Sequence, residues 1–219
     1  HHEDFTGQYG KFYAAFQNTP WYKDQKRLYE KNARELGFNK VSELKLEVAK
    51  KIKEFVFSGG FLFAMCSATD SYDIALASEG VDICQHMFDG DAMDSDIDKN
   101  LDFEKTLAFK NFNLVKDPNK YEFSSIDATQ SRRVKAKIDF FTLFDFSAKW
   151  DPIPTMLCQN HMQVIKGFMG QTTAFKKQYL KSNVIVMGET NLSNEARYIH
   201  GKLGNGTWTF YGGHDPEDY

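Results

Sequence analysis

Residues 52–73 read IKEFVFSGGFLFAMCSATDSYD, and the expected fold class follows from them. The pattern indicates a helix that ends at Gly59 and Gly60, a short continuous apolar run, FLFAMC, and a second helix that ends at Gly80. A continuous apolar run of this length is typical of a strand that is buried on both faces. Helix, strand and helix in this order predict an α/β fold with a parallel sheet.

Further elements are expected on both sides of this segment. Helices are predicted over 10–18 and 21–36, and the helix that leads up to the two glycines has Ser42 as its N-cap. Strand patterns follow in the second half of the chain, at 107–115, 120–126, 139–146 and 184–189, and 196–213 reads as a hairpin with its turn at 204–206.

The composition is that of a globular protein of one domain, which we expect to span residues 1–219. Hydrophobic residues make up 42% and charged residues 26% of the chain, and a core of this size is self-supporting. The formal net charge of −3 provides no basic excess, so the sequence predicts no nucleic-acid partner. No apolar run reaches the length of a membrane span, so no membrane insertion is expected. The aromatic content of 15% predicts a heavy core and an aromatic-walled cleft.

Both ends of the sequence read as cuts through a longer protein. The chain begins with HHEDFTG, which resembles the end of a strand running into a loop, and it stops at GGHDPEDY, just after another strand. We therefore expect the domain to be truncated at both ends.

The cysteines and acidic residues predict neither a metal site nor a cofactor. Cys66, Cys84 and Cys158 are irregularly spaced, which matches no disulfide framework and no zinc site, although a single Cys84–Cys158 disulfide stays open. The acidic segment 88–96, FDGDAMDSD, lacks the glycine and the closing glutamate of a calcium-binding loop. We interpret it as a solvated loop.

Cys66 is the first candidate for chemistry. It lies between the predicted strand and the following helix, where a nucleophile elbow holds its nucleophile on a strained turn between small residues. The residues two before and two after it are Ala64 and Ala68, where glycine is usual. The start of the helix offers backbone N–H groups that favour a thiolate and an oxyanion. The alternative is an inert, buried thiol at a strand end.

A nucleophilic cysteine needs a base, and His214 is the candidate. It follows a strand and two glycines in GTWTFYGGHDPEDY, and Asp215 or Glu217 could orient its ring. The alternative is a loop histidine beside a proline-containing turn. His161 and His200 are interpreted as structural or exposed.

Two loops could complete the site. Thr6 and Gly7 would lie at the carboxyl edge of the sheet if a strand ends just before them, and ligands bind at that edge in open α/β folds. A backbone N–H there could form an oxyanion hole with the N–H of Ser67. The segment 167–175, GFMGQTTAF, lacks the ending of a phosphate loop, but it could be a binding loop beside the cleft.

These segments carry a resemblance to a known family. IKEFVFSGGFLFAMCSATDSYD together with GKLGNGTWTFYGGHDPEDY resembles the class I glutamine amidotransferase-like superfamily, in particular its trehalose-utilisation (ThuA-like) branch. Through HHEDFTGQYGKFY, KGFMGQTTAF and EARYIHGK, essentially the whole chain looks like a group of Bacteroidota proteins labelled "asparagine synthetase B".

The resemblance implies a fold, a site and a location. The fold would be a flavodoxin-like three-layer α/β sandwich with a mainly parallel sheet and an added β-rich segment. In the implied Cys–His–acid site, Cys66 matches the nucleophile, His214 the base and Glu217 the acid. The natural protein would be longer at both ends, with a signal-like segment that indicates a periplasmic or exported protein.

Two hypotheses of different classes therefore stay open. In the first, Cys66 attacks the carbonyl of a glutamine-like amide while His214, oriented by Glu217 or Asp215, transfers the proton. In the second, the chain is a catalytically degenerate relative that binds a small ligand, a sugar or a protein partner in the same cleft. A ThuA-like role in sugar processing is a third idea.

Overall fold

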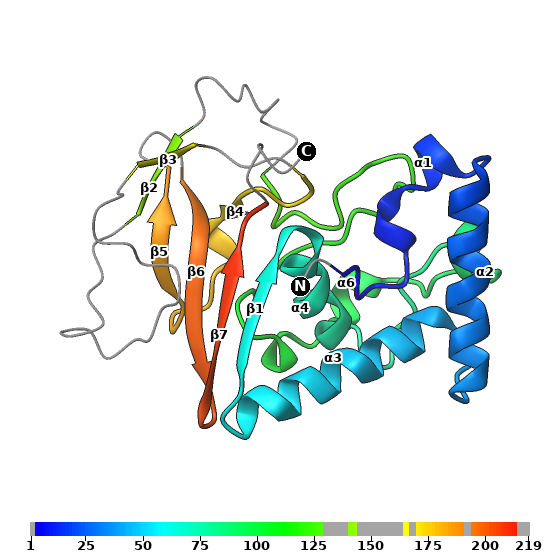
Figure 1. The fold of residues 1–219 in the computed structure, drawn as a ribbon, viewed down its shortest axis with the longest axis horizontal. Coiled ribbons are helices and arrows are strands. Elements are labelled where there is room, and N and C mark those ends of the chain that lie inside the picture. The colour runs from blue at the N-terminus through cyan, green and yellow to red at the C-terminus, as the bar shows by residue number, and fades with distance from the viewer. Residues whose placement is uncertain (1–2, 129–139, 144–163, 167–169, 191–193, 214–219) are drawn as a thin grey trace.

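A computed structural model of the chain describes residues 3–128, 140–143, 164–166, 170–190 and 194–213 (Figure 1). It confirms an α/β fold, with an open mixed sheet and helices. Figure 1 shows the strands side by side, α3 running from the β1 edge of the sheet toward α2, and α2 standing apart from the strands. Among the helices described, none is both long and apolar enough to cross a bilayer.

The helices vary widely in length. The α-helices are α1 (Tyr13–Phe16), α2 (Pro20–Glu35), α3 (Val41–Phe57), α4 (Asp70–Ala77), α5 (His86–Asp89) and α6 (Ile97–Asn100). Short 3₁₀ turns occur at η1 (Tyr9–Lys11), η2 (Cys66–Ala68), η3 (Phe103–Lys105) and η5 (Lys177–Tyr179). The helix predicted over 21–36 is thus confirmed as α2, whereas the one predicted over 10–18 shrinks to η1 and α1.

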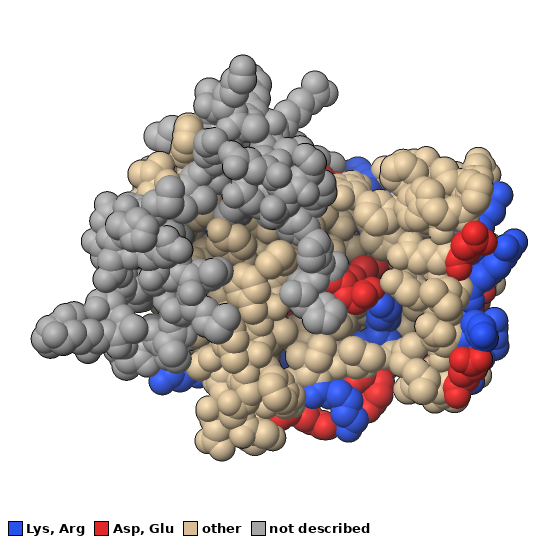
Figure 2. All heavy atoms as spheres, viewed as in Figure 1, with Lys and Arg blue, Asp and Glu red and all other residues tan. Residues whose placement is uncertain are grey.

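Helix α3 begins one residue before the predicted cap. Its N-cap is Lys40 and not Ser42. The Glu43 carboxylate accepts the backbone N–H groups of Asn39 and Lys40, at 2.9 and 3.2 Å, so a glutamate three residues into the helix satisfies the donors at its start. On the outer side of the molecule, α2 carries acidic and basic side chains along its length, and Figure 2 shows them alternating down that edge.

One sheet contains every strand described. The strands are β1 (Phe61–Met65), β2 (Phe140–Leu143), β3 (Val164–Lys166), β4 (Phe175–Lys176), β5 (Ile185–Glu189), β6 (Glu195–Leu203) and β7 (Gly206–Tyr211). Their order is β1-β7-β6-β5-β2-β3, and β4 pairs with β6. The strands predicted over 139–146, 184–189 and 196–213 correspond to β2, β5 and the β6–β7 hairpin.

The prediction of a mainly parallel sheet is wrong for the described strands. Among the described strands only β1 and β7 pair in parallel, and all the other pairs are antiparallel. The reason is the length of the connections: β6 and β7 are joined by Gly204 and Asn205 alone, and such a short turn can join only antiparallel neighbours. The flavodoxin-like arrangement is accordingly not confirmed.

The strands expected over 107–115 and 120–126 do not form. This region makes only isolated bridges, Leu114 with Ser124 and Phe109 with Leu180. The backbone N–H groups of residues 107–109 instead donate to the buried Asp73 carboxylate of α4, at 2.7, 2.7 and 2.9 Å. Those donors are therefore lost to a strand ladder.

The main core lies where α3 and α4 meet the sheet. Strand β1 alternates, with Leu62 and Ala64 buried and their neighbours half-buried, so burial on both faces is not complete. The largest buried side chains of this core are Tyr72, Phe109, Phe175, Trp208 and Phe210. A second cluster joins α2 to the loops beside it and comprises Tyr9, Tyr22, Ala33, Val41, Cys84 and Phe88.

Candidate functional site

Cys66 lies at the turn between strand β1 and helix α4. Its backbone φ is +56°, a left-handed value that non-glycine residues rarely adopt. Ala64 and Ala68, the flanking small residues, are 1% and 0% exposed, so a larger side chain at either position would have to displace the core. Cys66 is therefore held in the strained strand-to-helix geometry that the sequence predicted for it.

Thr69 closes the turn behind Cys66. Its hydroxyl and its backbone N–H both donate to the Cys66 carbonyl oxygen, at 2.7 and 3.1 Å. A threonine hydroxyl is suited to this task because it can replace a backbone donor in a short turn. The bonds hold the carbonyl and so maintain the unusual backbone angle of Cys66.

The N-terminal loop is folded against the same turn. Asp4 organises it: one carboxylate oxygen accepts the backbone N–H and the hydroxyl of Thr6, both at 2.7 Å, and the other accepts the N–H of Gly10 at 2.8 Å. The backbone N–H of Phe5 donates to the Ser71 hydroxyl at 3.2 Å, which fastens the loop to the start of α4. The loop thereby lies beside Cys66, although no strand is described before it.

A cavity of about 290 Å³ opens between these two segments. Cys66, Ser67 and Gly7 all line it. Aromatic rings form much of its wall, from Tyr9, Phe12, Tyr29 and Tyr121. The predicted aromatic-walled cleft beside the cysteine is thus present.

Three charged side chains also line the cavity, those of Glu3, Asp4 and Lys45. Lys45, from α3, forms an ion pair with Glu3, and their side chains are 13% and 33% exposed. The Lys45 ammonium also lies 4.6 Å from the centre of the Tyr29 ring, in cation–π contact. The cavity wall therefore carries one cationic group, Lys45, and two carboxylates, of which Asp4 already accepts hydrogen bonds from the N-terminal loop.

The Cys66 thiol is held mainly in its neutral form by the described surroundings. Burial raises its pKa, the backbone N–H groups of Ser67 and Gln171 lower it, and the carboxylates of Asp70 and Asp127 raise it further. The net direction is upward. Because the thiolate is the nucleophile, Cys66 needs a nearby base in order to react.

The structure brings together part of the predicted site. Gly7 and Ser67 share the cavity with Cys66, as expected. Thr6 is buried and does not line this cavity, because its hydroxyl is turned to Asp4. The predicted base and acids, His214, Asp215 and Glu217, lie outside the described residues, as do His161 and Cys158.

His200 has a structural position. It is fully buried in strand β6, and its Nδ1 lies 2.9 Å from the Thr209 hydroxyl on the neighbouring strand. Burial lowers the pKa of His200, with a smaller contribution from the Lys202 charge, so the ring is neutral at pH 7. The interpretation of His200 as structural therefore agrees with its surroundings.

Three residues of the cavity were not predicted individually from the sequence. Glu3 and Lys45 meet across 42 positions of the chain, and Gln171 reaches the Gly10 carbonyl across 161. The only signal for Gln171 was the glycine-rich segment 167–175, predicted as a binding loop, and its residues Gly170 and Gln171 do line the cavity. Such long-range pairs leave no periodic pattern in a single sequence.

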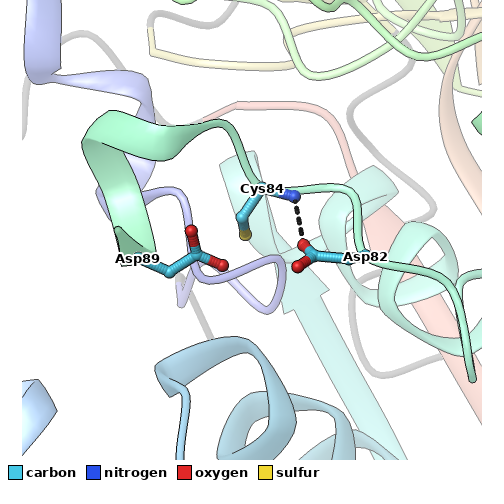
Figure 3. A group of neighbouring side chains, drawn as sticks. All are labelled: Asp82, Cys84 and Asp89. Atoms are coloured by element: carbon cyan, nitrogen blue, oxygen red, sulfur yellow. Dashed lines mark hydrogen bonds between the residues drawn. The ribbon is translucent and has the colours of Figure 1, made fainter. Parts of the chain in front are cut away.

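A second group of polar side chains lies at and just before the acidic segment 88–96. Potential ligand atoms of Asp82, Cys84 and Asp89 all lie within 4.8 Å of one another (Figure 3). The Cys84 N–H donates to Asp82 at 3.0 Å, and its thiol donates to the Thr6 carbonyl at 3.3 Å. Cys84 is a free thiol, so the disulfide that the sequence left open is not formed.

Lys40 provides the positive charge for this cluster. Its ammonium pairs with Asp82, Asp89 and Asp91, at 3.2 Å in the case of Asp89 and 2.7 Å in that of Asp91. Burial lowers the pKa of Lys40, but the three hydrogen bonds outweigh it, and the net direction is upward. Because a lysine already compensates the carboxylates, we interpret the group as an ion-paired corner of the fold.

Comparison of the chain with protein-family models, with curated proteins and with solved structures finds no match.

Proposed function

We propose that this protein is a cysteine-dependent amidohydrolase of the glutamine amidotransferase-like type, with a glutamine-like amide as its substrate. The observation that carries the proposal is the backbone of Cys66: a positive φ at a strand–helix turn, with the residue on the wall of a cavity. Strained residues of this kind cluster at functional sites. The turn from β1 into α4 is also the unit that a flavodoxin-like core would share.

The reaction would pass through a thioester. The Cys66 thiolate attacks the amide carbonyl carbon, a C–S bond forms, and the oxygen becomes an oxyanion that backbone N–H groups near Ser67 and Gly7 receive. The C–N bond then breaks, and the protonated base gives its proton to the departing ammonia. A water molecule that the same base deprotonates attacks the thioester, and the C–S bond breaks to release the carboxylic acid.

We assign the base to His214, with Glu217 or Asp215 as the group that orients it. The support is chemical: the described surroundings leave Cys66 protonated, so the mechanism requires a proton acceptor from elsewhere in the chain. His214 follows directly after Gly213, the residue that ends the described segment behind β7. Strand β7 is the parallel neighbour of β1, so both strands run toward the same edge of the sheet.

The charged pair of the cavity supports an amino-acid amide as substrate. A glutamine-like molecule carries an α-carboxylate and an α-ammonium, and Lys45 and Glu3 offer the opposite charges. The volume of about 290 Å³ lies at the lower end of the range for small-molecule sites. The substrate would therefore be a small amide and not a folded protein.

The alternative is a degenerate relative that binds a small ligand, such as a sugar, without turnover. The raised pKa of Cys66 favours it, because an unactivated thiol is a poor nucleophile. The aromatic wall favours it as well, since aromatic rings offer flat apolar faces to a ligand. The two functions share a cavity and differ in the reactivity of Cys66.

A glutaminase assay on the full-length protein distinguishes the amidohydrolase from the non-catalytic binding protein. We expect ammonia release from glutamine, its loss in Cys66→Ser and at least a hundredfold fall in kcat in His214→Ala, since a general base contributes roughly that factor. His86→Ala is the matched control, because the His86 side chain is exposed on helix α5 and the variant should keep full activity. Absence of turnover on any small amide, with glutamine-like ligands still bound, would establish the binding function instead.

A further inference from the structure

Thr172 is anchored by two buried carboxylates. Its hydroxyl donates to Asp70 Oδ1 at 2.9 Å, and its backbone N–H donates to Asp127 Oδ2 at 3.2 Å. Thr172 and Asp70 are 0% exposed and Asp127 is 3% exposed. The backbone φ of Thr172 is +58°, so these bonds hold a residue in a conformation that threonine does not favour.

Gln171, the preceding residue, joins this anchor to the cavity. Gln171 lines the cavity together with Cys66, and its backbone N–H is one of the groups that lower the pKa of the Cys66 thiol. Its side-chain amide donates to the carbonyl oxygens of Gly10 and Tyr121, at 3.2 and 2.6 Å. Gln171 is 2% exposed and contacts the cysteine and two other parts of the cavity wall.

The carboxylate pair is unusual in its own right. Asp70 begins α4, four residues after Cys66, and its Oδ2 has no hydrogen-bond partner within the described part of the chain. Burial and, after it, the charge of Asp127 raise the pKa of Asp70 well above its ordinary value. Two buried acids that meet at one threonine cost stability, which is a reason to look for a role beyond packing.

We propose that Thr172 is a positioning residue, which Asp70 and Asp127 hold so that the Gln171 backbone N–H faces the Cys66 sulfur. The N–H then stabilises the thiolate together with the Ser67 N–H. Gln171 becomes a backbone donor of the site that the sequence did not indicate. Stabilisation of the Cys66 thiolate by Gln171 does not require that the protein turn over a substrate. Only the use of this thiolate in amide hydrolysis rests on the proposed function.

The test measures the reactivity of Cys66 and not catalysis. The rate of Cys66 alkylation by iodoacetamide is followed against pH on the full-length protein, with the labelled peptide identified by mass spectrometry. Thr172→Val removes the hydroxyl and keeps the branched shape, and Thr172→Ser keeps the hydroxyl as the conservative control. We expect the alkylation midpoint of Thr172→Val to rise by about one pH unit, or about tenfold slower labelling at a fixed pH below it, because a hydrogen bond to the charged form lowers a pKa. Thr172→Ser should keep the midpoint of the natural protein.

A second variant guards against a general loss of structure. Thr172→Gly also lacks the hydroxyl, but glycine adopts the positive φ without strain, so this variant should fold even if the valine variant does not. It should show the same upward shift. A midpoint unchanged in the folded valine or glycine variant would overturn the proposal, as would an equal shift in Thr172→Ser. Glutaminase activity of the natural protein is assayed in parallel, so a failed function and a failed positioning role give different results.

Discussion

Lys45 places its ammonium 4.6 Å from the centre of the Tyr29 ring, on the wall of the cavity that contains Cys66. If this ammonium receives the substrate carboxylate, Lys45→Gln should raise KM for glutamine at least tenfold and change kcat little, since a hydrogen bond to a charged group contributes about 1.5–3 kcal/mol. Steady-state kinetics measure both constants. Lys51→Gln, an exposed position on the same helix, is the control. An unchanged KM in Lys45→Gln would exclude Lys45 from substrate binding.

Because the backbone at Cys66 is left-handed, we expect a glycine variant at this position to be more stable than an alanine variant. A glycine usually destabilises a regular element relative to alanine, but at φ +56° alanine carries a steric cost of about 1–2 kcal/mol that glycine avoids. Cys66→Gly should therefore be more stable than Cys66→Ala by about 1 kcal/mol in urea unfolding. Ala64→Gly, in the adjoining strand, should show the ordinary loss. Equal stability of the two Cys66 variants would mean that the turn relaxes without its thiol.

The β6–β7 turn lies against the end of α3, so its glycines leave no room for a side chain. A Cβ on Gly206 would come within 2.0 Å of the Val56 carbonyl oxygen, and one on Gly204 within 2.5 Å of the Phe57 carbonyl oxygen. Gly206→Ala should destabilise the protein by more than about 2 kcal/mol, because helix and hairpin would have to separate. Gly80→Ala is the matched control: its φ is +84° but a Cβ there meets nothing within 4 Å, so only backbone strain of about 1 kcal/mol is expected. Thermal unfolding of both variants provides the comparison, and similar losses would contradict the clash.

Asp73 predicts a pH dependence of stability. Burial raises its pKa to about 6, although three backbone N–H groups oppose the shift. Since the folded-state value lies above the ordinary value of about 3.9, the contribution of Asp73 is fully present below about pH 4 and is lost as the pH rises through 6. The stability of the natural protein relative to Asp73→Asn should fall by about 3 kcal/mol between pH 4 and pH 7. Urea unfolding of both proteins across this range measures the change. A pH-independent difference would contradict the prediction, because it would show that the N–H groups cancel the effect of burial.

The ion pairs of Lys40 predict that the stability of a Lys40→Met variant depends on added Ca²⁺. Lys40→Met would leave Asp82, Asp89 and Asp91 uncompensated and should destabilise the protein by about 2 kcal/mol. Millimolar Ca²⁺ should restore part of that loss, because the carboxylate oxygens suit a hard cation. Lys99→Met, which breaks an exposed pair with Asp96, should cost less than about 0.5 kcal/mol and gain nothing from Ca²⁺. A Lys40→Met protein as stable as the natural one would show that the ion pairs contribute little.

Local pattern was a good guide to some elements and a poor one to others. Helix α2 follows from its alternating charges and the glycine after it, strand β5 from its apolar run, and the hairpin from the glycines of its turn. The strand expected over 107–115 failed at its start, because Asp73, more than thirty positions earlier, accepts the N–H groups of residues 107–109 that a ladder would use. The parallel sheet failed because strand order depends on pairing between distant segments, which periodicity does not encode.

The amino-acid sequence alone was sufficient to place Cys66 between a buried strand and a helix, with small residues on both sides, because each of these features is encoded within about ten neighbouring positions. The positive φ of Cys66, the cavity it faces and the charges in that cavity were decided by tertiary contacts. Glu3 meets Lys45 across 42 positions and Thr172 meets Asp70 across 102, so these contacts exist only once the chain has folded. The chemistry of a thiol depends on such neighbours, since burial, charge and hydrogen bonds set its pKa.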